Sequence, residues 1–160
     1  MIRIHFERGK SFLEYLIMGI QAAKLKRLNL PFREVYSHVS IELDGTVYQT
    51  KPSGGFSIKK YQESQNTSNI PERRKTYVIH ERFNVDIANR LSSFTFNNQS
   101  YPYFKAFWNG VYSLTGRYFG RKKPKKVHCY SFVAKMIGMK DWWKKDAIDI
   151  ETEIINNMNC

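Results

Sequence analysis

Residues 35–51 read VYSHVSIELDGTVYQTK, and this stretch predicts the central hairpin of a β-sheet. The pair Asp44-Gly45 is a strong signal for a two-residue turn, because such turns need positive φ angles. The residues on either side alternate between apolar and polar, as strands with one buried face do. With this turn His38 and Gln49 lie on the same face as diagonal neighbours, close enough for the amide to hold the imidazole.

The rest of the chain predicts one domain of mixed helices and strands. We expect strands at 2–6, 35–43, 46–51, 57–61 and 76–82, helices at 11–28, 84–96, 129–137 and 150–158, and irregular structure around a short helix at 101–120. These elements predict a single α+β domain spanning residues 1–160.

The first expected helix begins at Ser11, a residue type that caps helix N-termini, and ends before Pro31. Apolar side chains recur along it at helical spacing, so we expect this stripe to face the core. The expected buried stripe consists of Leu13, Leu16, Ile17, Ile20 and Ala23.

A cysteine opens the helix expected at 129–137. The thiolate is the reactive form of cysteine, and a helix N-terminus and nearby cations both favour it. Cys129 is therefore a candidate nucleophile, and a small buried core residue is the alternative. The other cysteine, Cys160, ends the chain, so reduced thiols are a simpler interpretation than a disulfide framework and favour a reducing compartment.

A cysteine nucleophile needs a base within hydrogen-bond reach and a group that orients the base. His38 is the best candidate base, with Gln49 to orient it, although a strand histidine without chemistry is the alternative. His128 adjoins Cys129, but neighbouring helical residues point about 100° apart, which makes it a poor base. His5 and His80 are expected on strands without a catalytic role.

Positive charge dominates the composition. The chain carries 26 Lys and Arg against 14 Asp and Glu, a formal net charge of +12. Such a surface attracts nucleic acid, anionic lipid or acidic wall polymers. A run of cations precedes Cys129 and is a candidate substrate or polyanion site, with a solvated loop as the alternative. The run consists of Arg117, Arg121, Lys122, Lys123, Lys125 and Lys126.

The motifs and their order resemble the circularly permuted NlpC/P60 cysteine hydrolases of the papain-like superfamily. That family includes YiiX-type and lecithin:retinol acyltransferase-like proteins, and the chain is most similar to small bacteriophage-encoded members. The matching segments are Phe6–Ser11, Tyr36–Ile41, Asp44–Gln49, Ser100–Phe104 and Cys129–Val133. The chain departs from the pattern at Ser40, where glycine is usual, at Gln49, where Glu or His is commoner, and at Phe104, where an acid is usual.

The resemblance implies a papain-like fold, with an antiparallel sheet packed against helices and the nucleophile at a helix N-terminus. It implies a thiol hydrolase or acyltransferase that cleaves amide or ester bonds through an acyl-thioenzyme, with peptidoglycan peptides as a substrate. By the same resemblance Cys129 is the nucleophile, His38 the base, Gln49 the orienting residue and Tyr103 a border of the oxyanion site. The alternative is an inactive basic virion or binding protein that contacts nucleic acid or another polyanion.

Neither a metal nor a cofactor is expected, since the sequence has no Cys-x-x-Cys, no His-x-x-x-His and no phosphate-binding glycine loop. The N-terminus does not resemble a secretory signal. The most apolar stretch, 12–23, carries Glu14 and is too short to span a bilayer. We therefore expect a host-cytoplasmic or virion-associated protein without a transmembrane segment.

Overall fold

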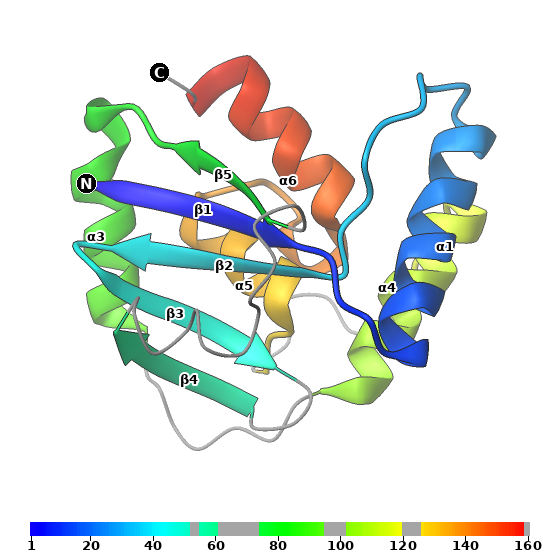
Figure 1. Cartoon of the computed structure of the whole chain (residues 1–160), viewed down its shortest axis with the longest axis horizontal. Helices are drawn as coiled ribbons and strands as arrows, with labels where there is room; N and C mark the ends of the chain where they lie inside the picture. The colour runs from blue at the N-terminus through cyan, green and yellow to red at the C-terminus, as the bar shows by residue number, and fades with distance from the viewer. Residues whose placement is uncertain (52–54, 61–73, 95–101, 120–125, 159–160) are drawn as a thin grey trace.

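A five-stranded antiparallel sheet forms the centre of the molecule (Figure 1). The computed structural model describes residues 1–51, 55–60, 74–94, 102–119 and 126–158. The strands are β1 (Ile2–Glu7), β2 (His38–Leu43), β3 (Thr46–Lys51), β4 (Gly55–Lys60) and β5 (Arg74–Val78), in the order β4-β3-β2-β1-β5. The chain is therefore an α+β protein, as expected. β1, the first strand in the sequence, lies inside the sheet between β2 and β5.

The predicted hairpin is confirmed. Asp44 and Gly45 have φ angles of 47° and 78°, and Leu43 pairs with Thr46. Positive φ at both central positions matches the right-handed twist of the flanking strands, which explains why this dipeptide fixes the register. The register carries on from the hairpin into β1, where Ile4 lies opposite Ile41.

One face of the sheet is apolar and is covered by helices. α3 (Asn84–Ser93), α5 (Cys129–Met136) and α6 (Ala147–Glu153) lie behind the sheet in Figure 1. Phe132 of α5 packs edge-on against Phe56 of β4, with ring centroids 5.4 Å apart. Ile41 is opposite Tyr48 and Tyr48 is opposite Ile58, so Phe56, two residues before Ile58, points to the same face as Ile41. The helices therefore pack on the face formed by Val39 and Ile41.

The opposite face of the sheet is polar, yet its central side chains are buried. His5 Nε2 donates to Glu42 Oε2 at 2.8 Å, and His5 Nδ1 accepts from the Thr76 hydroxyl at 2.8 Å. Arg3 adds a bond of 2.7 Å to Glu42 Oε1. Pairing satisfies these groups, as buried polar atoms require. His5 is thus a structural residue on a strand, while His80 is exposed just beyond β5.

Two helices stand side by side at one end of the molecule: α1 (Phe12–Arg27) and α4 (Tyr103–Thr115) (Figure 1). The expectation of mostly irregular structure at 101–120 was wrong, because α4 has 13 residues. It ends at Gly116, whose φ of 74° suits a helix stop. Aromatic side chains lower helix propensity only slightly, and packing against α1 outweighs that cost.

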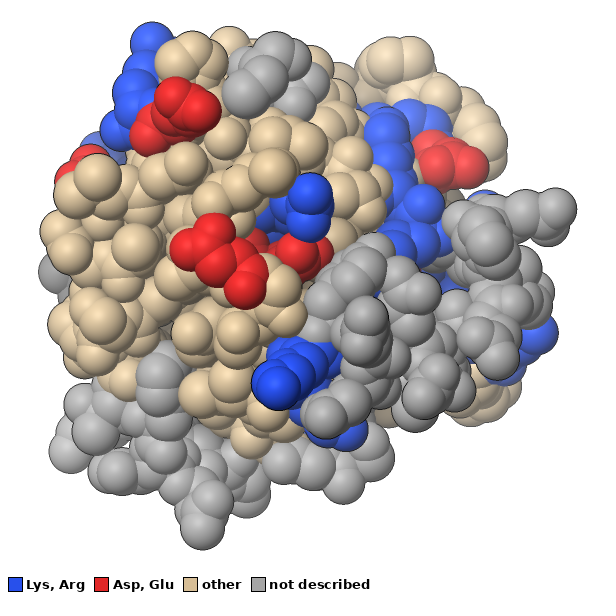
Figure 2. Space-filling view, turned by 60° about the vertical axis from the view of Figure 1, so that its left-hand side comes forward, with Lys and Arg blue, Asp and Glu red and all other residues tan. Residues whose placement is uncertain are grey.

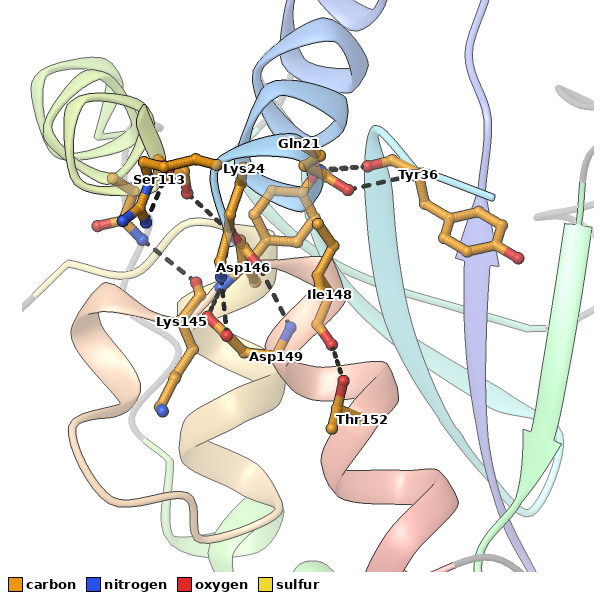
Figure 3. Close-up of polar contacts among 12 residues, drawn as sticks. Gln21, Lys24, Tyr36, Ser113, Lys145, Asp146, Ile148, Asp149 and Thr152 are labelled. Carbon is orange, nitrogen blue, oxygen red and sulfur yellow. Dashed lines mark hydrogen bonds and ion pairs between the residues drawn. The ribbon is translucent and has the colours of Figure 1, made fainter. Parts of the chain in front are cut away.

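The buried face of α1 also differs from the prediction. The helix buries Gln21 and Lys24, whereas Leu13 and Leu16 are exposed. Polar partners cause this reversal. Lys24 Nζ lies 2.9 Å from Asp146 Oδ2 and 2.8 Å from Asp149 Oδ1, and Ser113 donates to Asp146 (Figure 3). A buried ion network, together with buried Met18 and Leu25, therefore fixes how α1 faces the molecule, and the expected apolar stripe does not.

Other elements agree with the sequence apart from their ends. α3 buries Ile87 and Leu91, and Gly138, just after α5, has a φ of 81° that suits a helix stop. The last helix begins at Ala147 because Asp146 caps it, accepting from the Asp149 N–H at 3.1 Å. Short helical segments complete the chain at Glu81–Phe83, Trp142–Lys144 and Ile154–Met158. Within the described ranges no helix is both long and apolar enough to cross a bilayer.

Candidate functional site

His38 and Gln49 meet on the polar face of the sheet, as the hairpin register predicted. His38 Nε2 lies 3.2 Å from Gln49 Oε1, and both side chains are buried. An amide oxygen only accepts, so Nε2 donates the proton and Nδ1 of the neutral ring keeps its lone pair. The bond therefore orients the imidazole with a basic nitrogen directed away from Gln49.

Glu7 is a neighbour of His38 that sequence reasoning missed. The two residues are directly opposite in the pairing of β1 with β2. Arg74 of β5 forms an ion pair with Glu7 on the other side. Burial raises the pKa of Glu7, but His38 and Arg74 outweigh burial and hold that pKa below its usual value. Glu7 continues the alternation of the first strand, so the sequence contained the signal once β1 was paired with β2.

His38 is a neutral imidazole at neutral pH. Burial lowers its pKa, and Glu7 offsets this in part by favouring the charged form. The carboxylate of Glu7 thus supplies the negative charge that Gln49 lacks. His38 has the electronic state of a general base and a neighbour able to stabilise its protonated form.

Cys129 is the first residue of α5, as predicted, and it is deeply buried. Its exposed fraction is 3 %, and it belongs to the apolar cluster that includes Val39 and Ile41. The first turn of α5 is fixed at the beginning of β2, where the Tyr130 hydroxyl donates to the Tyr36 carbonyl oxygen at 2.7 Å. The cysteine and His38 therefore belong to the same end of β2.

The register nevertheless separates these two residues. α5 packs on the face that carries Val39, and strand alternation turns His38 to the opposite face, where it bonds to Gln49. The side chain of His38 and the helix that carries Cys129 thus lie on opposite faces of the sheet. Periodicity could not reveal this, because the side of the sheet on which α5 packs is a long-range choice.

A second pair of buried polar side chains, Asn109 and His128, lies at the start of α5. Sequence reasoning missed Asn109 as the partner of His128. Asn109 of α4 donates to His128 Nε2 at 2.8 Å, so His128 is held as a neutral ring. Burial and the neighbouring Lys105 hold the pKa of His128 well below its usual value. His128 caps α5 and is a structural residue rather than a base for Cys129.

Lys105 is the most unusual titratable group among the described residues. Its side chain is buried, its Nζ has no hydrogen-bond partner in the part of the chain that the structure describes, and the ammonium lies 4.8 Å from the Trp142 ring centroid. Burial, aided by Lys135, lowers the pKa of Lys105 to about 7. A lysine within an aromatic stretch gave no sign of this in the sequence.

The remaining expected site residues are distributed as follows. Tyr103 is the first residue of α4, with 58 % of its side chain exposed. Arg117 and Lys126 are exposed. The expected site residues Arg121, Lys122, Lys123 and Lys125, together with Cys160, lie outside the described residues. In the described part of the chain, no three His, Cys, Asp or Glu side chains are grouped to hold a metal ion.

Charged groups are mixed on the face shown in Figure 2. Acidic side chains lie beside basic ones there, and most of the described surface is uncharged. Among the described residues on this face, Lys and Arg form several separate groups, and most of these groups lie beside acidic side chains.

No family model, curated protein or solved structure matches this chain.

Proposed function

We propose that this chain is a cationic binding protein that attaches to a polyanion or an anionic surface without cysteine chemistry. The observation that carries the proposal is a set of exposed cations that stand outside the ion pairs formed among the described residues. They are Arg8, Lys10, Lys26, Lys59, Lys60 and Lys140. With a net charge of +12, such cations release counterions when they bind a polyanion.

Salt titration of heparin or oligonucleotide binding tests this proposal. Affinity is expected to fall steeply as salt rises from about 50 to 200 mM, because phosphate or sulfate contacts displace condensed ions. The double variant Arg8→Gln/Lys10→Gln is expected to bind about tenfold more weakly at low salt, with a shallower salt slope.

Two controls accompany this titration. Lys144→Gln is the control for the loss of a cation that is already paired, since Lys144 lies 3.0 Å from Asp141, and Cys129→Ala is expected to bind like the parent protein. Binding that is insensitive to salt, or that is lost in Cys129→Ala, would refute the proposal.

A papain-like cysteine hydrolase is the second candidate function, and the His38–Gln49 bond favours it. In that reaction His38 takes the proton of the Cys129 thiol, the thiolate attacks an amide or ester carbonyl, and the leaving group departs with that proton from His38. Water then releases the acyl group. For this chemistry Sγ must reach the Nδ1 of His38, so the proposal requires a rearrangement at the start of α5. Its test is the dependence of thiol reactivity on His38.

A further inference from the structure

α1 and α4 expose apolar side chains at one shared end. The two helices run parallel: a Cβ at Gly110 would lie 3.4 Å from Ile20, and further along Arg27 bonds to the Ser113 carbonyl oxygen at 3.3 Å. Both N-termini therefore lie together, at the lower end of the pair in Figure 1. The exposed side chains of this end, here called the helix-pair tip, are Phe12, Tyr15, Leu16, Tyr103, Phe104 and Phe107.

The side chains of the helix-pair tip are large, apolar and mostly exposed to solvent. Phe12 is 86 % exposed and Phe104 is 72 % exposed. Phe104 and Phe107 stack on one another with centroids 6.5 Å apart, so the rings cover each other only in part. Contiguous exposed apolar surface of this kind marks a contact with a partner or a membrane.

The charges around the tip select an anionic partner. Arg8 and Lys10 are exposed immediately before α1. The two nearby acids along the chain are both engaged: Glu7 is paired with Arg74, and Glu14 accepts from the Ser11 N–H at 2.9 Å and from its hydroxyl at 2.7 Å. Aromatic and aliphatic side chains next to cations are the composition of a helix end that lies in the headgroup region of an anionic bilayer.

Other occupants fit this surface less well. A second copy of the chain would bring two +12 proteins together. Single-stranded nucleic acid would stack on the rings but would leave aliphatic Leu16 without a suitable contact. We propose that the helix-pair tip inserts into the interface of a membrane containing anionic lipids. The anionic character of the partner rests on the proposed function, whereas insertion rests on the exposed apolar side chains.

Vesicle co-sedimentation tests the proposal with full-length protein. Binding is expected to phosphatidylcholine vesicles that contain phosphatidylglycerol and to be much weaker without it. Phe12→Ser/Phe104→Ser is expected to lower the partitioning of the protein into vesicles at least tenfold. The variant lacks two aromatic rings and therefore buries less apolar area in the bilayer. Phe32→Ser is the matched control, because Phe32 is 89 % exposed but lies beyond the far end of α1.

The outcomes separate this inference from the proposed function. Unchanged heparin binding in Phe12→Ser/Phe104→Ser, together with lost vesicle binding, is the expected result. Vesicle binding that survives the double substitution, or that Phe32→Ser weakens equally, overturns insertion and leaves a purely electrostatic contact. Parent protein that binds heparin but no vesicle overturns the inference alone. If the parent protein is a dimer that dissociates in the double variant, the tip is a dimer interface and the inference is overturned. If the double variant loses binding to single-stranded oligonucleotides, the tip binds nucleic acid and the inference is likewise overturned.

Discussion

Lys105→Met is expected to raise the free energy of unfolding at pH 6 by several kcal/mol. The folded-state pKa of about 7 lies far below the usual 10.5, so protonating this buried amine opposes folding. That difference corresponds to at most about 4 to 5 kcal/mol, present in full below pH 7. Between pH 7 and 10.5 the unfolded state binds more protons, so the parent protein gains stability as pH rises, and the gain from methionine disappears above that range.

Urea unfolding of Lys105→Met and the parent at several pH values measures this effect. Lys10→Met is the control, since Lys10 is exposed and its loss is expected to change stability by less than about 0.5 kcal/mol. Two results would contradict the claim that Lys105 is buried without a partner among the described residues: Lys105→Met less stable than the parent at pH 6, or a stability difference that does not depend on pH.

Asp146→Ala is expected to destabilise the protein by about 3 to 5 kcal/mol. Burial lowers the pKa of Lys24, but Asp146 and Asp149 outweigh burial and raise it, so Lys24 is charged inside the protein. Removing Asp146 leaves that charge with Asp149 as its remaining carboxylate partner and removes the N-cap of α6. It also takes the acceptor from Ser113, which loosens the α1–α4 pair from the rest of the molecule.

Thermal or urea unfolding measures this loss, with Asp141→Ala as the matched control. Asp141 pairs with Lys144 near the surface, and such pairs contribute about 1 kcal/mol or less. A cost for Asp146→Ala no greater than that of Asp141→Ala would show that the network does not hold α1 in place.

Local chemistry explains what could be predicted from the sequence. Asp44-Gly45 fixes its turn through backbone preferences alone, and period-2 geometry then brings His38 to Gln49. The cap at Ser11 and the stop at Gly138 are equally local. These features depend on residues that are close in sequence, and the pattern contains the information that they need.

Long-range partners explain what the sequence could not give. The side chain that orients α1, Lys24, is paired with an aspartate 122 positions away, so apolar periodicity identified the wrong face. Because of that error Leu16 was expected to be buried, although it is exposed, and the helix-pair tip was not predicted. In the same way, the resemblance implied that Cys129 and His38 meet, but the motifs could not reveal that α5 packs on the sheet face opposite to His38.

Attachment without cysteine chemistry and hydrolysis make opposite demands on Cys129. Attachment needs an inert core residue, and hydrolysis needs a thiolate beside His38. The apolar surroundings of Cys129 and the direction of His38 agree with the first demand. The bond between His38 and Gln49 meets one requirement of the second.

The most direct measurement is the rate of Cys129 alkylation by iodoacetamide as a function of pH, in a Cys160→Ser background. The account predicts that the folded protein reacts at least about tenfold more slowly than urea-unfolded protein at pH 7, and that His38→Ala and the exposed control His80→Ala both leave this rate unchanged. Faster alkylation in the folded protein at pH 7, lost in His38→Ala but not in His80→Ala, would contradict it and establish an activated cysteine.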